Sequence, residues 1–165
     1  MVAIRGEALA SVAAVDIRPN AHLDASESAD ATWLLRGVSG HTRYTTRVEL
    51  DPLRAQSPEL GRREATCAAL IPIRKSDAWW ALSQDERREI FEGRSRHIVD
   101  TMQYLPRIAR RLYHARELGQ PFDFLTWFEF APEHAAAFDE LVGMLRTRDE
   151  WTFVEREVEI RLSTA

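Results

Sequence analysis

Two strand-like runs joined by a short turn constrain the fold of this chain more than any other part of its sequence. In the first run, residues 107–116, the side chains separate into two sets when every second residue is taken. The second run, residues 122–130, is dense in aromatic and β-branched residues, which favour strands. Residues 117–121, Glu-Leu-Gly-Gln-Pro, have the composition of a turn. The sequence therefore predicts an antiparallel β-hairpin.

Arg110 lies on the apolar face of this predicted hairpin, together with Ile108 and Leu112. A guanidinium among apolar side chains is unfavourable unless an anion or another partner meets it. The more common explanation for such an arginine is an ion pair at the surface or in a groove. The alternative is that Arg110 faces a cavity that holds an anion.

A helix is predicted to begin after Ser83, because Ser83 and Glu86 have the spacing of a capping box. The apolar stripe of this helix comprises Ile90, Phe91, Ile98, Thr101, Met102 and Leu105, and Pro106 ends it. His97 follows Ile90 by seven residues, so it lies almost above Ile90 at the edge of the stripe. Its imidazole is then half-buried and neutral, which suits binding of iron. A lone histidine in such a place is nevertheless more often an ordinary core residue.

The sequence resembles the chlorite dismutases of the short-chain lineage in residues 69–98, 104–134 and 145–162. The likeness extends over about 33–162. In that family a histidine on a helix binds haem b, and a distal arginine follows it thirteen positions later. His97 and Arg110 have this spacing. The resemblance therefore implies that His97 is the axial ligand of a ferric haem b and that Arg110 is the catalytic residue on the distal side.

The resemblance implies further site residues around the haem. In the family a glutamate accepts a hydrogen bond from the axial histidine, with a lysine close by, and the matching positions here are Glu150 and Lys75. The family's tryptophans beside the haem correspond to Trp79 and Trp80, and its tyrosine near the haem propionates corresponds to Tyr44. Taken without the resemblance, the two tryptophans are more often core residues, and the two charged residues would be ordinary surface groups.

The implied activity is the conversion of chlorite to chloride and dioxygen, with formation of an O–O bond and no external reductant. Arg110 would hold the chlorine oxyanion beside the haem. Two alternatives share the fold, a haem peroxidase and a haem-binding or carrier protein. A third is a haem-free module whose aromatic hairpin lines a small-ligand cavity. A peroxidase needs a distal base, and His114 is the one candidate for it. We nevertheless expect surface positions for all histidines other than His97, namely His22, His41, His114 and His134.

Bulk properties limit the other function classes. The formal charge of −4 and the pI of about 5.8 argue against nucleic acid or an acidic membrane surface as a partner. Cys67 is the only cysteine, so an internal disulfide and a Cys-x-x-Cys-His attachment are excluded, and any haem must be bound non-covalently. Glu7 and Asp16 interrupt the N-terminal segment, and no apolar run of about 18 residues occurs. We therefore expect a cytoplasmic protein without a membrane span.

The 165 residues, 45% of them hydrophobic, are enough for one domain, residues 1–165. The other predicted elements are a helix that begins at Pro132, a loop at 20–32, and strands at 9–17, 33–38, 65–73 and 154–162. Residues 43–50 fit either a strand or a helix. In the last strand, the residues expected to face outward are Glu155, Glu157, Glu159 and Arg161.

This order of elements indicates an α+β fold. The resemblance implies a ferredoxin-like antiparallel β-barrel with outer helices, of the dimeric α+β barrel type, in which the N-terminal half is truncated. It also implies that the protein forms a homodimer.

Overall fold

The computed structural model describes residues 1–18, 30–40 and 43–163. A five-stranded antiparallel sheet forms its centre, with the strand order β1-β5-β2-β4-β3. The strands are β1 (Val2–Arg5), β2 (Cys67–Lys75), β3 (Ile108–His114), β4 (Phe124–Phe130) and β5 (Val154–Ser163). From β2 onward the chain follows the order β-α-β-β-α-β, and its four strands lie in the order β5-β2-β4-β3. The predicted α+β, ferredoxin-like fold is confirmed.

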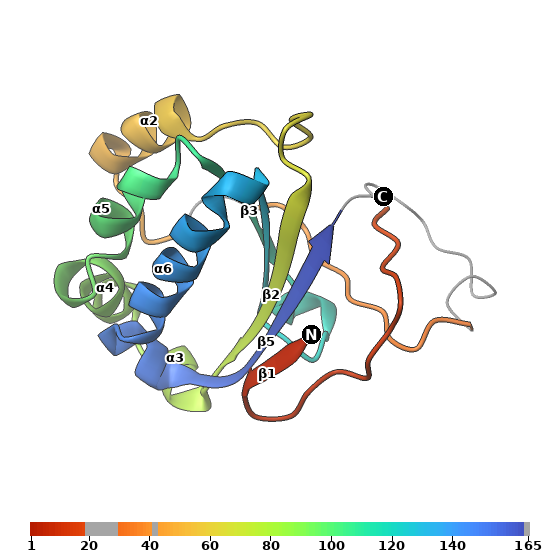
Figure 1. The fold of residues 1–165 in the computed structure, drawn as a ribbon. Coiled ribbons are helices and arrows are strands. Elements are labelled where there is room, and N and C mark those ends of the chain that lie inside the picture. Colours follow the sequence, from red (N-terminus) through yellow and green to blue (C-terminus); the bar gives the residue numbers. More distant parts are fainter. Residues whose placement is uncertain (19–29, 41–42, 164–165) are drawn as a thin grey trace.

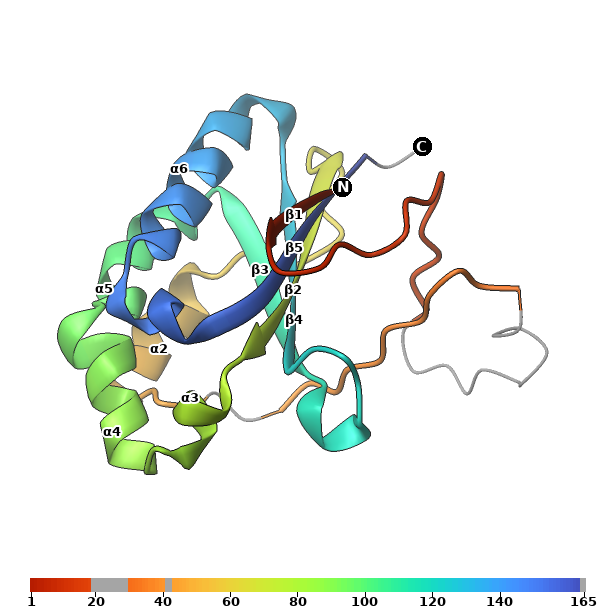
Figure 2. The ribbon, with the colours of Figure 1, turned by 90° about the horizontal axis from the view of Figure 1, so that it is seen from below.

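The helices cover one face of this sheet, on the left of Figure 1, and the described N-terminal segments lie on the other side (Figures 1 and 2). The longer helices are α2 (Arg47–Gln56) and α6 (Ala135–Arg146), and the shorter ones are α3 (Asp77–Ala81), α4 (Gln84–Arg88) and α5 (His97–Thr101). η1 (Glu89–Arg94) is a π-helical turn. The 3₁₀-helical turns are η2 (Met102–Tyr104), η3 (Arg116–Leu118), η4 (Pro132–His134) and η5 (Asp149–Phe153). None of the helices in the described ranges has the length and apolarity needed to cross a membrane.

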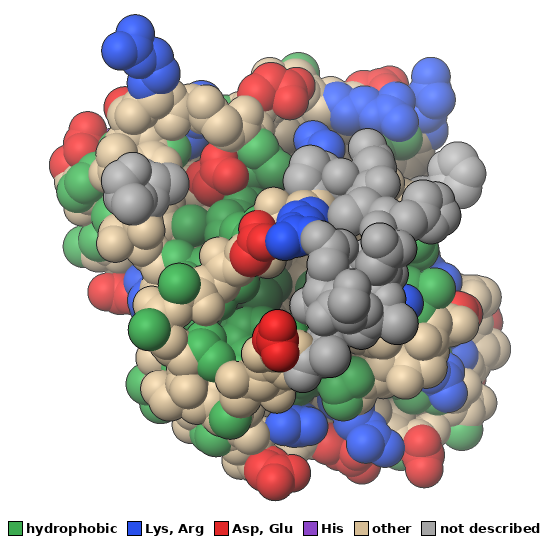
Figure 3. Space-filling view, turned by 90° about the vertical axis from the view of Figure 1, so that its right-hand side faces the viewer, with side chains coloured by type: hydrophobic (Ala, Val, Ile, Leu, Met, Phe, Trp, Pro, Cys, Tyr) green, Lys and Arg blue, Asp and Glu red, His purple; other side chains and the backbone are tan. Residues whose placement is uncertain are grey.

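Each face of the sheet has its own apolar cluster. On the helical side, Phe128 and Phe130 of β4 pack against Phe138 of α6, with ring centroids 5.1 and 4.7 Å apart. The buried face of α6 comprises Phe138, Leu141, Val142 and Leu145, as its spacing predicted. On the other side, the buried residues Leu125, Val158 and Ile160 are covered in part by Leu9, Trp33 and Leu35. Figure 3, which faces the right-hand side of Figure 1, shows hydrophobic side chains around a hollow.

The predicted hairpin is confirmed. Strands β3 and β4 pair in antiparallel fashion, with Arg110 opposite Phe128 and Leu112 opposite Thr126. The connection is the short turn η3, and Gly119 ends it with a φ of 65°, a conformation that glycine adopts without steric cost. Arg110 and Leu112 therefore point toward the helical side of the sheet, where they line a cavity.

The helix that was predicted to run from Ser83 to Pro106 is interrupted. Its start is confirmed, because Ser83 and Glu86 form a capping box. The backbone then widens into the π-helical turn η1, and Arg96 has a left-handed φ of 51°, so a new helix, α5, begins at His97. The prediction that His97 and Ile90 lie on one face of a continuous helix was wrong. His97 is nevertheless buried, as expected.

Several predictions for the first half of the chain were also wrong. Residues 9–17 form no strand, and the N-terminal strand is β1 instead. In residues 33–38, only Val38 makes a β-bridge, to His114. Residues 43–50 were ambiguous, and from Arg47 they belong to α2. The loop predicted at 20–32 lies mostly outside the described residues. Strand β2 confirms the buried run expected at 65–73, displaced by two residues.

The outward face predicted for β5 is exposed at Glu155 and Arg161, but not at Glu157. The pairing of β5 with β2 shifts register opposite Arg74 and Lys75, and beyond this shift Glu157 is only 1% exposed. Val158 and Ile160 face the N-terminal side, whereas Glu157 faces α6 and accepts hydrogen bonds from Arg146. Glu155 and Arg161 are thus exposed as predicted, whereas Glu157 lies against α6 and not in water.

Candidate active site

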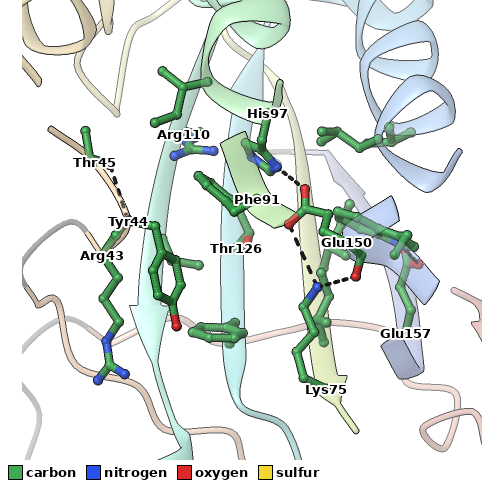
Figure 4. Close-up of a pocket in the computed structure, with 18 of the residues that line it drawn as sticks. Arg43, Tyr44, Thr45, Lys75, Phe91, His97, Arg110, Thr126, Glu150 and Glu157 are labelled. Atoms are coloured by element: carbon green, nitrogen blue, oxygen red, sulfur yellow. Dashed lines mark hydrogen bonds and ion pairs between the residues drawn. The ribbon is translucent and has the colours of Figure 1, made fainter. Parts of the chain in front are cut away.

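A cavity lies between the sheet and the helical layer. Strands β2, β3 and β4 contribute one wall, and α5, α6 and the turns beside them contribute the other (Figure 4). Most of the lining side chains are apolar, and the charged ones are Arg43, Lys75, Arg110, Glu150 and Glu157. A concave, mainly apolar pocket with a few polar groups is typical of a site for a cofactor or a small ligand.

His97 and Glu150 form a buried pair in this cavity. Nδ1 of His97 shares a hydrogen bond with Oε1 of Glu150, and both side chains are nearly excluded from solvent. Burial raises the pKa of the Glu150 carboxyl, but His97, Lys75 and Arg110 outweigh this effect and hold that pKa below its ordinary value. An ionised carboxylate can only accept, so Nδ1–H of His97 is the donor. In an imidazole whose one proton is on Nδ1, Nε2 carries the free lone pair that can bind a metal.

Lys75 lies beside this pair at the end of β2. Its Nζ donates to the backbone carbonyl oxygen of Glu150 at 2.8 Å and lies 3.9 Å from Oε2 of the same residue. Burial lowers the pKa of Lys75, while Glu150, Asp123 and Glu157 counteract this by favouring the ammonium. Nζ also lies over the rings of Trp79 and Trp151, 4.6 and 5.4 Å from their centroids.

Arg110 enters the cavity from β3, on a different wall from Glu150 (Figure 4). Among the described residues its guanidinium forms no hydrogen bond or ion pair. The Arg110 side chain is only partly buried from solvent. Burial nevertheless lowers the pKa of Arg110, and the charge of Glu150 acts against this by raising it. An arginine remains protonated even under such a shift. The arrangement therefore offers a fixed cation to an anionic ligand.

The aromatic residues predicted for the site divide into two groups. Trp79 and Tyr44 line the cavity, with their rings 6.0 Å apart. Nε1 of Trp79 is buried and finds no partner among the residues that the structure describes. Trp80 is not among the lining residues. It donates to Asp123 at 3.2 Å and stacks on Phe124, so it supports the wall from behind.

Further residues line the cavity that were not predicted as site residues, and among them are Phe91, His114, Arg43 and Glu157. The ring of Phe91 stacks on the imidazole of His97, with centroids 4.3 Å apart. His114 is 7% exposed, which corrects the expectation of a surface position. Position on the Arg110 face of the hairpin could have identified His114, but no local pattern indicates the other three.

Known proteins resemble this chain in sequence and in fold. The family model for chlorite dismutase matches residues 9–164. The solved dimeric chlorite dismutase from Nitrobacter winogradskyi is 55% identical, has a TM-score of 0.91, and aligns with 99% of this chain and 90% of its own. A solved mutant chlorite dismutase from Candidatus Nitrospira defluvii, in complex with cyanide, is 28% identical with a TM-score of 0.66, covering 78% of this chain and 52% of its own.

A curated chlorite dismutase from Ideonella dechloratans is 36% identical over 110 residues, which are 61% of this chain and 35% of that protein. The chain thus spans about a third of this curated relative and about half of the Nitrospira protein, but most of the Nitrobacter one. The family model and the Nitrobacter structure both extend over nearly the whole chain. The chain therefore belongs to the chlorite dismutase family.

Proposed function

We propose that this protein is a haem b enzyme that converts chlorite to chloride and dioxygen. The observation that carries the proposal is the placement of two opposed groups in one cavity. One is the buried His97, whose Nδ1 is engaged by an ionised Glu150, and the other is Arg110, a cation without a protein partner among the described residues. The first group suits an iron ligand and the second suits an anionic substrate.

The cavity has the properties that a haem requires. His97 would hold the haem iron through Nε2. The apolar walls suit the macrocycle, and the unpartnered indole N–H of Trp79 is a donor for a polar group of a bound ligand. Cyanide, which the solved Nitrospira relative binds, is a typical ligand of haem iron. We propose that the haem is ferric and held non-covalently.

In this mechanism the protein controls charge and orientation. When bound, the haem would supply the redox chemistry that converts chlorite to chloride and dioxygen. The Arg110 guanidinium holds the chlorite anion, and afterwards the chlorine oxyanion, in the cavity by charge-assisted hydrogen bonds. Glu150 keeps Nδ1–H of His97 engaged, which increases the basicity of Nε2. The reaction is balanced, because one chlorite contains all the atoms and electrons of one chloride and one dioxygen.

We also propose that two copies form a homodimer, because the Nitrobacter relative that covers nearly the whole chain is described as dimeric. Chlorite is the proposed substrate, and nucleic acid is not expected as a partner on account of the net charge of −4. The cytoplasmic location expected from the sequence stays a prediction.

Oxygen release on an electrode, after chlorite is added to the haem-loaded protein, tests the proposed function. Wild type should release oxygen rapidly, His97→Ala should release none, and Arg110→Ala should release little and bleach early. Arg111→Ala is the matched control, because Arg111 neighbours Arg110 in β3 but is exposed on the opposite face. A fully loaded wild-type protein that released no oxygen would refute the proposal, and a durable Arg110→Ala enzyme would refute the role of Arg110.

The buried position of His114 favours a second candidate, a haem peroxidase. His114 lines the same cavity as Arg110, where an imidazole can serve as the distal base that a peroxidase needs. The two activities separate in His114→Gln. If the protein is a peroxidase, this substitution should lower peroxide-dependent oxidation of a dye about 100-fold. If chlorite conversion is the function, oxygen release should be nearly unchanged.

A further inference from the structure

The axial histidine candidate stands directly after a break in the helical backbone. Before the break, the amide of Ser95 donates to the carbonyl oxygen of Ile90, five residues earlier, which defines the π-helical turn η1. Arg96 then has a left-handed φ of 51°, and His97 is the first residue of α5. A non-glycine residue in this conformation costs about 1 kcal/mol, so surrounding contacts must hold it. The direction of the His97 side chain therefore depends on what holds this break.

Glu92 holds the side of the break that carries His97. Its Oε2 accepts from the amide of Ile98 at 2.6 Å, and its Oε1 accepts from the amide of Val99 at 3.3 Å. These are first-turn amides of α5, which have no acceptor within their own helix. Both hydrogen bonds are made to the backbone amides that directly follow His97. They therefore fix the backbone from which the imidazole projects.

Ser95 holds the other member of the pair. Its Oγ accepts from the amide of Glu150 at 3.1 Å, and Ser95 is only 1% exposed. One residue separates Ser95 from His97, so the two halves of the His97–Glu150 hydrogen bond are tied to the same short segment. Asp100 of α5 adds an ion pair to Arg148 at 2.6 Å, which docks η5 onto the same helix.

We propose that Glu92 and Ser95 are positioning residues that set the hydrogen bond between His97 and Glu150. Neither touches the cavity or the reacting groups, and each acts through the backbone of a residue that does. Glu92 orients His97, and Ser95 sets the position of Glu150 against it. The importance of this hydrogen bond for catalysis rests on the proposed function. The roles of Glu92 and Ser95 in positioning the two side chains apply to the haem-free protein as well.

The variants are chosen to remove one bond at a time. Glu92→Ala removes both bonds to the first turn of α5, Glu92→Gln keeps one acceptor oxygen, and Ser95→Ala removes the acceptor for the Glu150 amide. Arg94→Gln is the matched control. Arg94 lies in the same segment and pairs with Asp149, but this pair is exposed and 3.6 Å long. Glu150→Gln serves as the reference for a weakened pair.

The first measurement uses haem-free protein. The Nδ1–H proton of His97 should resonate far downfield in wild-type spectra, because it donates to a buried carboxylate. It should move upfield in Glu92→Ala and Ser95→Ala, less in Glu92→Gln, and not in Arg94→Gln. An unchanged proton in both Glu92→Ala and Ser95→Ala would overturn the inference. Should Glu92→Ala fail to fold, Glu92→Gln and Ser95→Ala decide by the same criterion.

The second measurement uses haem-loaded, ferrous protein. The iron–histidine stretching frequency should fall in Glu92→Ala and Ser95→Ala toward the value of Glu150→Gln, and haem affinity should drop about tenfold. Glu92→Gln should recover part of the frequency, which a purely structural role would not produce. If wild type takes up no haem, or if His97→Ala keeps the wild-type frequency, the proposed function fails. The haem-free result then still decides the inference.

Discussion

Nζ of Lys75 lies 2.8 Å from the backbone carbonyl oxygen of Glu150 and 3.9 Å from Oε2 of the same residue. Glu150 in turn engages His97 through its other carboxylate oxygen. One buried carboxylate thus faces a cation on one side and an imidazole on the other. Its charge is stabilised by both, which makes the stability of the haem-free protein dependent on pH.

Lys75→Met should lower the free energy of unfolding of the haem-free protein by about 3 kcal/mol at neutral pH, because it leaves a buried carboxylate without its cation. The folded-state pKa of Glu150 is lowered, so its contribution to stability is present above its unfolded pKa and is lost as the pH falls through the folded value. Without Lys75 the folded pKa rises, and the loss should begin at a higher pH. Urea unfolding at a series of acidic pH values measures both effects.

Arg74→Met is the control for this substitution. Arg74 is the neighbour of Lys75 in β2, but it is exposed and its ion pair with Glu155 is 3.8 Å long. We expect the free energy of unfolding to change by less than about 1 kcal/mol and to depend on acidic pH as it does in wild type. Equal losses in the two variants would contradict the role given to Lys75.

Arg110→Leu should leave the stability of the haem-free protein within about 1 kcal/mol of wild type, or increase it. The reason is that the guanidinium is desolvated and forms no hydrogen bond or ion pair in the described part of the chain, so an apolar side chain removes a cost. Chemical denaturation measures the change. A loss above about 2 kcal/mol would show that Arg110 is a structural residue.

Arg43 should accelerate the entry of anions. It lines the cavity while 35% of its side chain remains exposed, and it pairs only loosely with Glu117 at 3.4 Å. In haem-loaded Arg43→Ala, the association rate of azide should fall about threefold at low salt and converge with wild type at high salt. Stopped-flow absorbance measures this rate.

The controls for Arg43 use charge in two ways. At a pH above its own pKa, imidazole is a neutral ligand, so its association rate there should be the same in wild type and Arg43→Ala. Glu117→Gln removes the carboxylate that pairs with Arg43, and azide should then bind faster than in wild type. An equal slowing of azide and imidazole in Arg43→Ala would point to a change in cavity shape instead.

Glu157→Gln should destabilise the protein by about 2–4 kcal/mol, although β5 reads as a half-exposed strand. Glu157 accepts from Trp151 at 2.8 Å and from Arg146 at 2.9 and 2.7 Å, and the substitution weakens these charge-assisted bonds. Glu155→Gln, in the same strand but exposed, should change stability by less than about 0.5 kcal/mol. Thermal unfolding of both variants tests the difference.

Sequence reasoning succeeded where the determining chemistry is local. The capping box at Ser83 depends on residues three apart, and the β3–β4 hairpin depends on alternation and on a turn with Gly119. The pairing of His97 with Glu150 and Lys75 came from the family resemblance, and the structure brings these three side chains together. Their individual roles stay predictions.

Sequence reasoning failed where contacts distant in the chain decide the conformation. At the helical break before His97, Oγ of Ser95 accepts a hydrogen bond from the amide of Glu150, a contact that no local pattern predicts. The inward turn of Glu157 follows from a register shift between β2 and β5. Trp79 lines the cavity and Trp80 does not, because adjacent residues on a short helix point in different directions.

The N-terminal segment has a consequence for handling the protein. Leu9, Trp33 and Leu35 pack over the apolar cluster on the face of the sheet that the helices leave uncovered. None of these three lines the cavity. A truncated form that begins near Gly37 would therefore keep the cavity residues but expose a broad hydrophobic sheet face, and it should aggregate during purification. The leading segment acts as a solubilising cover that any shortened version for crystallisation has to retain.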